Sequence, residues 1–161
     1  MALGIKNYKE IDEVSKSLHS KGKKLVLVGG CFDVIHIGHI DFLENAKSLG
    51  DILIVLLESD ATLTRLKGMH RPIHTQKDRA RILTALQSVD LVITLPEIIN
   101  DKVYDNVILG LKPAIIATTI GDNSISHKRR QANIISARLV ELPKTANYST
   151  SKVARLLEKE I

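Results

Sequence analysis

Two histidines, His36 and His39, lie three residues apart in the segment GGCFDVIHIGH, residues 29–39. On a helix they would lie on the same side of one turn. The first turn of a helix carries unsatisfied N–H groups and a partial positive charge, and imidazoles above it can donate hydrogen bonds to phosphate oxygens. Gly29 and Gly30 lack a Cβ atom, so a ligand can approach the backbone closely. The segment therefore predicts a site for a phosphorylated ligand.

The same residues have plainer interpretations. A histidine pair at this spacing is often part of a protein surface or a fragment of a metal site. Cys31 and Asp33 are the nearest further ligands, but their spacing matches no metal-binding pattern, so no metal site is predicted. Cys31 is the only cysteine, and its place beside Phe32 favours a small packed residue over a nucleophile.

Short apolar runs alternate with amphipathic stretches along most of the chain. The runs predict strands at 25–28, 52–57, 91–94, 114–117 and 138–142. The helical spacing of apolar residues predicts helices at 5–21, 40–49, 76–86, 100–109 and 150–161. This order predicts an α/β fold, a Rossmann-like doubly wound parallel sheet of about five strands with helices on both faces. Ligands of such sheets bind at the carboxyl ends of the strands, where residues 29–39 would lie.

The composition is that of one globular domain. The chain has 161 residues, 44% hydrophobic and 25% charged, without a repeat or a linker. We expect a single domain over 1–161, with a leading helix within 1–24 and a core over 25–161. The longest apolar run is far shorter than the roughly 20 residues that span a bilayer, and no secretion signal is evident. With one cysteine, no internal disulfide can form, and these features together predict a cytoplasmic protein without a membrane segment.

The charge favours anionic partners. The formal net charge is +5 at pH 7, which nucleotide phosphates satisfy as well as nucleic acid does. Aromatic residues make up only 3% of the chain and tryptophan is absent, which argues against a surface of base-stacking side chains. We therefore expect no nucleic-acid partner, and we interpret the basic run 127–130 as a solvated helix face.

Four motifs in the same order resemble one family. GGCFDVIHIGH is similar to the HxGH signature of the nucleotidyltransferase superfamily, which is also called cytidylyltransferase-like. LENAKSLGDILIVLLESD, residues 43–60, resembles its second strand and the flanks of that strand. RLKGMHRPIHTQKDRARILTALQSVD, residues 65–90, looks particularly like heptose 1-phosphate adenylyltransferase domains. LPKTANYSTSKV, residues 142–153, resembles the RTxGxSTT segment, so the resemblance covers nearly the whole chain.

The resemblance implies transfer of a nucleoside monophosphate from ATP or CTP to a phosphorylated small molecule, such as a sugar 1-phosphate, with release of pyrophosphate. The acceptor phosphate attacks the α-phosphorus in line, so catalysis consists of positioning and charge neutralisation. His36, His39 and Lys47 are implied as catalytic residues, with Lys47 reaching a substrate phosphate. Mg²⁺ is implied with the triphosphate. Many relatives are dimers, so a homodimer is one option.

Further site residues follow from the matched motifs. Nucleotide binding is implied for Gly30, Cys31, Phe32, His36, His39, Asp122, Ser149, Thr150 and Ser151. Binding of substrate phosphates is implied for Lys67, Arg79 and Lys144, with Lys67 reaching the acceptor phosphate. Arg79 could instead belong to a solvated helix face together with Lys77 and Arg81. The serine and threonine hydroxyls at 149–151 can both cap the last helix and bind phosphate.

Departures from the family pattern leave the base and the acceptor open. Residues 119–123, TIGDN, lack the lysine and one glycine of KGGDY in heptose adenylyltransferases, and also the aromatics of glycerol-phosphate cytidylyltransferases. Lys144 replaces an arginine, and Asn147 stands where glycine is usual. The alternatives are a cytidylyltransferase for a small alcohol phosphate of the glycerol 3-phosphate type, an FMN adenylyltransferase, or a non-catalytic nucleotide-binding module. HIGH also marks class I aminoacyl-tRNA synthetases, but the chain is short for their anticodon-binding module.

Overall fold

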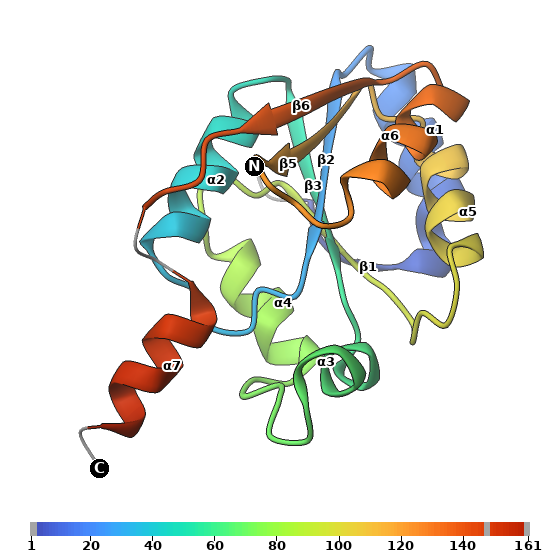
Figure 1. Ribbon diagram of the computed structural model, residues 1–161. Helices are drawn as coiled ribbons and strands as arrows, with labels where there is room; N and C mark the ends of the chain where they lie inside the picture. Colours follow the sequence, from blue (N-terminus) through green and yellow to red (C-terminus); the bar gives the residue numbers. More distant parts are fainter. Residues whose placement is uncertain (1–2, 147–148, 160–161) are drawn as a thin grey trace.

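The computed structural model describes residues 3–146 and 149–159, which form a six-stranded sheet with helices on both faces (Figure 1). The strand order is β1-β4-β3-β2-β5-β6, and every neighbouring pair is parallel. The strands are β1 (Gly4–Asn7), β2 (Leu25–Gly30), β3 (Ile52–Leu57), β4 (Leu91–Thr94), β5 (Ile115–Thr119) and β6 (Arg138–Leu142). The predicted α/β doubly wound parallel sheet is confirmed, with six strands where about five were expected.

The helices begin at capping side chains in several places. They are the short 3₁₀ helix η1 (Tyr8–Glu10), α1 (Ile11–Ser20), α2 (Ile37–Lys47), α3 (Asp60–Lys67), α4 (Gln76–Thr84), α5 (Lys102–Leu111), α6 (Ile125–Ile134) and α7 (Thr150–Glu158). The side chains of Ser59, Thr75 and Ser149 accept hydrogen bonds from backbone nitrogens three residues ahead and so cap α3, α4 and α7. No helix in the described residues is long and apolar enough to cross a bilayer.

The N-terminal segment differs from its prediction. A helix was expected over 5–21, but Gly4–Asn7 form the edge strand β1, which pairs with Leu91–Thr94 of β4. The Asn7 side chain accepts from the backbone nitrogen of Lys9 and starts η1, after which α1 begins at Ile11. A four-residue edge strand carries too short an apolar pattern to be separated from the amphipathic helix that follows it. At the other end, residues 160–161 of the predicted last helix lie outside the described residues.

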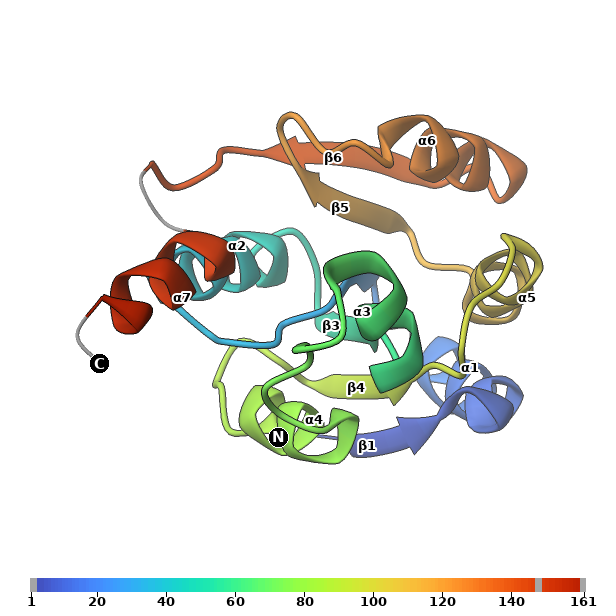
Figure 2. The same ribbon diagram turned by 60° about the horizontal axis from the view of Figure 1, so that its bottom comes forward.

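Strand β3 shows how the two apolar layers divide. Its side chains alternate between faces, with Val55 in the layer under α2 and α4, and Ile54 in the layer under α1, α5 and α6. Figure 2 shows these two groups of helices on opposite sides of the sheet. Helix α3 was not predicted, and of α6 only the solvated helix face at 127–130 was expected, because each helix buries only two residues and so lacks a long apolar stripe.

The chain reverses its direction of travel across the sheet at β2. From β2 it proceeds to β3 on one side and then β4, and it returns to place β5 on the other side of β2. The gap between the carboxyl ends of β2 and β5 is therefore a topological switch point, the usual place for ligands in such sheets. Residues 29–39 and the loop after β5 both lie at this edge.

Candidate active site

His36 and His39 form a stacked pair at the N-terminus of α2. Nδ1 of His36 accepts a hydrogen bond from the backbone nitrogen of Gly38 at 3.1 Å, and Nδ1 of His39 accepts from the backbone nitrogen of His36 at 3.4 Å. The ring centroids lie 3.9 Å apart with 29° between the planes. This reciprocal capping holds both rings against the first turn of the helix.

Both imidazoles are neutral at pH 7. Burial first, and then the neighbouring His36 and Lys67, lower the pKa of His39 to about 4. Burial also lowers the pKa of His36. Since Nδ1 of each ring is an acceptor, the neutral tautomer carries its hydrogen on Nε2. The pair therefore offers two Nε2–H donors without two charges that would repel each other.

A cavity of about 290 Å³ opens at the switch point beside this pair. It brings together ten of the predicted site residues, namely Gly30, Cys31, Phe32, His36, His39, Lys67, Asp122, Lys144, Ser149 and Thr150. Two of its lining cations, Arg71 and Lys128, are paired with carboxylates. The other two, Lys67 and Lys144, have no carboxylate within 4 Å among the described residues. The cavity therefore combines hydrogen-bond donors with excess positive charge, which suits a chain of phosphates.

The end of β2 is shaped by a close backbone approach. Phe32 has a positive φ of 46°, and a Cβ atom at Gly30 would lie 2.8 Å from the Phe32 ring. Only glycine fits there without moving the ring, which itself lies with its centroid 5.2 Å from that of His39. Burial raises the pKa of the Cys31 thiol, so this residue is not an activated thiolate.

Asp122 is held in a polar cluster after β5. Lys128 Nζ and Thr118 Oγ1 both donate to the Asp122 carboxylate, and the backbone nitrogen of Ser124 donates to its Oδ1 at 2.7 Å. Burial opposes ionisation of Asp122, but these hydrogen bonds outweigh it and hold the pKa of Asp122 below its ordinary value. The cluster fixes the loop that joins β5 to α6 at the edge of the cavity.

A second cavity of about 630 Å³ adjoins the first on the side of α3, α5 and α6. The two cavities share the lining residues Gly29, Gly30, Cys31, Thr119, Asp122, Lys128 and Lys144. The shared wall is thus the end of β2 and the loop after β5. Two ligands, one bound in each cavity, would therefore meet at this wall.

The N-terminus of α7 reaches the first cavity only in part. Ser149 caps the helix by accepting from the backbone nitrogen of Lys152 at 3.2 Å, and Thr150 Oγ1 donates to the carbonyl of Val34 at 3.4 Å. Both residues line the cavity, whereas Ser151 is exposed and is not among its lining residues. Asn147, which replaces the usual glycine, lies outside the described residues.

The structure does not bring Lys47 to the site. Its Nζ donates to Asp90 Oδ2 and to the carbonyl of Asp51, each at 2.5 Å, just before β4 and β3 begin. The helix runs back along the sheet from the carboxyl edge, so each residue beyond His39 lies about 1.5 Å farther from the histidines. Lys47 is at the opposite edge and holds the starts of two strands, which corrects the prediction that it contacts a substrate phosphate.

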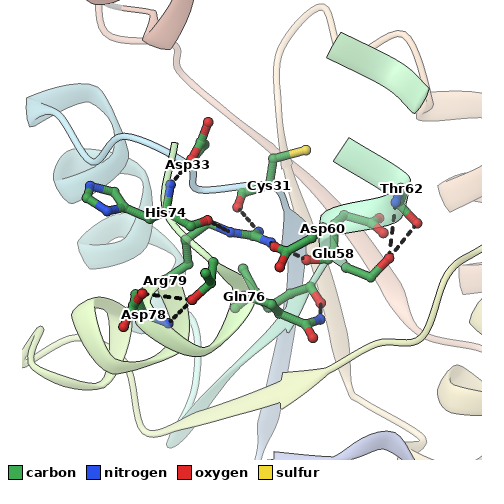
Figure 3. Close-up of polar contacts among 12 residues, drawn as sticks. Cys31, Asp33, Glu58, Asp60, Thr62, His74, Gln76, Asp78 and Arg79 are labelled. Atoms are coloured by element: carbon green, nitrogen blue, oxygen red, sulfur yellow. Dashed lines mark hydrogen bonds and ion pairs between the residues drawn. The ribbon is translucent and has the colours of Figure 1, made fainter. Parts of the chain in front are cut away.

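Arg79 is likewise a structural residue in this geometry. Its side chain is fully buried and its three nitrogens donate to the carbonyls of His74, Cys31 and Glu58 and to Asp60 Oδ1 (Figure 3). The guanidinium therefore joins the loops after β2 and β3 to the start of α4 and has no access to the cavity. This corrects both expectations for Arg79, as a phosphate ligand and as part of a solvated face.

Arg71 is a site residue that the motifs did not single out. It lines the first cavity, and its Nε donates to Asp33 Oδ2 at 2.5 Å. Burial opposes ionisation of Asp33, but the backbone nitrogens of His74 and Ile73, together with Arg71, hold its pKa below the ordinary value. Nη2 of Arg71 is buried without a partner among the described residues. Arg71 lies inside the family-like segment 65–90, but no spacing distinguishes it from a surface arginine.

The fold and the site together define a class of protein, the parallel α/β domain with a cationic cavity at its switch point, where such sheets bind their ligands. The chain belongs to the cytidylyltransferase-like family, whose model matches residues 27–156. The superfamily resemblance predicted from the four motifs is thereby confirmed.

Individual relatives agree with this membership. The chain is 47% identical over 112 residues to "Bifunctional protein HldE" of Nitratiruptor sp., which is 70% of this chain and 23% of that protein. The chain thus spans less than a quarter of this relative. The crystal structure of the lipopolysaccharide core biosynthesis protein from Thermoplasma volcanium has a TM-score of 0.66 at 25% identity, covering 77% of this chain and 99% of that chain. Pantoate-beta-alanine ligase from Francisella tularensis shares the fold, with a TM-score of 0.66 at 17% identity, covering 99% of this chain and 79% of that chain.

Proposed function

We propose that this chain is a nucleotidyltransferase that transfers a nucleoside monophosphate from ATP to a phosphorylated small molecule, such as a sugar 1-phosphate, and releases pyrophosphate. The observation that carries the proposal is the stacked, neutral pair of His36 and His39 at the N-terminus of α2, inside a cavity with excess positive charge. Membership of the cytidylyltransferase-like family and the similarity to HldE proteins support it.

The reaction needs positioning and charge neutralisation from the protein. An oxygen of the acceptor phosphate attacks the α-phosphorus, a new P–O bond forms, and the bond from the α-phosphorus to the bridging oxygen of the β-phosphate breaks. Pyrophosphate leaves with that electron pair, so no enzyme nucleophile is needed. The Nε2–H groups of His36 and His39 donate to the oxygens on which charge builds, and Lys67 and Lys144 offset the charge of the phosphates.

Mg²⁺ is proposed to enter with the triphosphate. Among the described residues no group of three or more His, Cys, Asp or Glu side chains is arranged to hold a metal ion. The donors that line the cavity are imidazoles, lysines and hydroxyls, which suit phosphate oxygens. Mg²⁺ bound to those phosphates would supply further charge neutralisation, while keeping several of its waters.

The two cavities suggest separate places for the two substrates. We assign the triphosphate to the smaller cavity, because the histidine pair and the start of α7 lie there. The larger cavity is left for the acceptor, whose phosphate would reach the α-phosphorus at the shared wall of Gly30 and Cys31. Lys144 lies on that wall without a carboxylate within 4 Å among the described residues and can neutralise both phosphates where they meet, whereas Lys128 on the same wall is paired with Asp122.

Pyrophosphate release tests the proposal. The enzyme is incubated with ATP or CTP and each of a panel of acceptors that includes hexose and heptose 1-phosphates, glycerol 3-phosphate and FMN. We expect release with ATP and a sugar 1-phosphate. Release only with CTP and glycerol 3-phosphate, or only with ATP and FMN, would replace the proposed substrates. Binding of a nucleotide without release from any pair would instead indicate a non-catalytic module.

A further inference from the structure

Glu58 is a buried carboxyl group in the wall of the larger cavity. It follows β3 directly, retains only 8% of its exposure, and is among the residues that line that cavity. Its main chain is fixed on both sides, since its nitrogen donates to the Gly30 carbonyl at 3.2 Å and its carbonyl accepts from Arg79 Nη2 at 2.9 Å. The side chain is therefore held in place by a rigid backbone.

The two oxygens of this carboxyl group differ. Oε1 accepts a hydrogen bond from the hydroxyl of Tyr104 on α5, whereas Oε2 is buried and has no partner among the described residues. A buried carboxyl oxygen without a hydrogen bond is costly, and native proteins keep few of them. A ligand in the cavity that supplies the missing partner would remove this cost.

The surroundings limit the kind of partner. Burial raises the pKa of Glu58 to about 7, against the opposing effect of Arg79, Arg65 and Lys128, so both protonation states are accessible at neutral pH. A hydroxyl group can donate to the carboxylate and accept from the carboxylic acid, so it matches either state. An ammonium group would match the carboxylate alone and would meet repulsion from the same three cations, and a phosphate would be repelled by the carboxylate.

The rest of the cavity orients such a ligand. Leu27, Leu56, Ile108 and Ile116 give it apolar walls. Two of its cations, Lys128 and Lys144, lie on the wall shared with the triphosphate cavity, whereas Arg65 lies away from that wall and donates to the Ile98 carbonyl. The acceptor phosphate belongs at that wall, so the carbon skeleton of the acceptor extends toward Glu58 and α5. A few fixed polar groups among apolar walls are what gives a small-molecule site its specificity.

We propose that Glu58 is a specificity-determining residue, whose Oε2 forms a hydrogen bond with a hydroxyl group on the carbon skeleton of the acceptor. Tyr104 is its positioning residue and holds the carboxyl group through Oε1. The inference rests on the proposed function and narrows its acceptor to polyhydroxylated phosphates, sugar phosphates above all. An acceptor that lacks the matched hydroxyl would leave Oε2 unpartnered, which sites of this kind reject strongly.

The test compares acceptors that differ by one hydroxyl group. kcat/KM is measured for the preferred sugar 1-phosphate and for its monodeoxy analogues in the wild type, in Glu58→Met and in Glu58→Gln, with Glu44→Met on the exposed face of α2 as control. We expect Glu58→Met to lower kcat/KM by about 10- to 100-fold for the hydroxylated acceptor and by less than about threefold for one deoxy analogue, with the KM for ATP unchanged. Equal losses for all acceptors, or no loss, would overturn the proposal.

Two further measurements keep the outcomes distinct. Glu58→Gln preserves the shape of the side chain, so it answers the question if Glu58→Met fails to fold. We expect it to lower the preference for the hydroxylated acceptor by about 10-fold above neutral pH, because the charge-assisted hydrogen bond is lost. Calorimetric binding of the same sugar phosphates, with a non-hydrolysable ATP analogue present, separates recognition from turnover. One outcome is that the wild type shows no turnover but binds the acceptors in a way that depends on the hydroxyl group and that Glu58→Met abolishes. This outcome would contradict the proposed function and leave the role of Glu58 intact. A wild type that binds no member of the panel would overturn the role of Glu58.

Discussion

The backbone nitrogen of His36 donates to Nδ1 of His39 at 3.4 Å, so the main chain of the first histidine orients the ring of the second. The rings stack at 3.9 Å, and burial keeps both of them neutral. Two imidazolium ions could not be stacked this closely without strong repulsion. The arrangement therefore presents a pair of neutral donors that is preorganised before any substrate binds.

Removal of one donor should impair the chemical step. We expect His39→Ala to lower kcat by about 100-fold or more, since a donor to the charge that develops in the transition state is lost. Steady-state release of pyrophosphate measures the effect, with His70→Ala at an exposed histidine outside both cavities as control. A kcat for His39→Ala within twofold of the wild type would remove His39 from the mechanism.

A Lys47 variant can distinguish the structural role that the geometry gives this residue from the catalytic role that the sequence motif implied. Because Lys47 pairs with Asp90 at the far edge of the sheet, we expect Lys47→Met to keep kcat within about twofold. The lysine side chain is 30% exposed, so the loss of stability should be about 1 kcal/mol, as for a partly screened ion pair. Urea denaturation and pyrophosphate release measure the two quantities, with the exposed Lys16→Met as control. A large fall in kcat at unchanged stability would restore Lys47 to the catalytic site.

Arg79 should be essential to stability. Lysine at this position could not reproduce the four hydrogen bonds of the buried guanidinium, and carbonyl groups of the loops after β2 and β3 would lose their donors. We expect Arg79→Lys to lower the free energy of unfolding by about 2–4 kcal/mol. Arg81→Lys, on the exposed side of the same helix, should change it by less than about 0.5 kcal/mol. Similar small changes in both variants, measured by urea denaturation, would contradict this role.

The buried strands were predicted well because their signal is local. The runs 52–57 and 91–94 match β3 and β4 residue for residue, since apolar stretches bounded by polar residues leave little choice of strand limits. The run 138–142 also matches its strand, β6, although β6 lies at the sheet edge and buries only Leu142. The edge strand β1 and the polar helix α3 were missed for the opposite reason, and α6 was expected only as a solvated helix face at 127–130. Their residues lie at a sheet edge or face solvent, and neither position requires a periodic apolar pattern in the sequence.

The sequence predicted which residues belong to the candidate site better than it predicted where each of them lies. Ten predicted residues line one cavity because the motifs follow strands whose carboxyl ends meet at the switch point. The predictions for Lys47 and Arg79 were wrong, because similarity to a sequence motif does not show at which edge of the sheet or on which face of a helix a residue lies. The spacing did hold a signal for Arg79, since Leu83 lies four residues further on and shares its buried face. Glu58 left no signal, because its role depends on Tyr104, which is 46 residues away.

The carboxyl group of Glu58 should make stability depend on pH in a direction opposite to that of an ordinary ion-paired carboxylate. Its pKa is about 7 in the folded protein, above the ordinary value of 4.5, because burial outweighs the attraction of Arg79, Arg65 and Lys128. The folded state therefore holds the proton more tightly than the unfolded state does. The protonated carboxyl group therefore makes its full contribution to the free energy of unfolding below about pH 4.5, and this contribution is lost as the pH rises through about 7.

Glu58→Gln isolates this contribution, since glutamine does not titrate. We expect the variant to gain stability relative to the wild type between about pH 5 and about pH 8.5, by on the order of 3 kcal/mol. Urea denaturation at both pH values measures the difference, and the exposed Glu44→Gln should show none. An equal stability difference at both pH values would mean that Glu58 ionises as it does in water. A hydroxylated acceptor should in turn stabilise the wild type more at the higher pH, because only there does it remove the cost of a buried, charged and unpartnered oxygen.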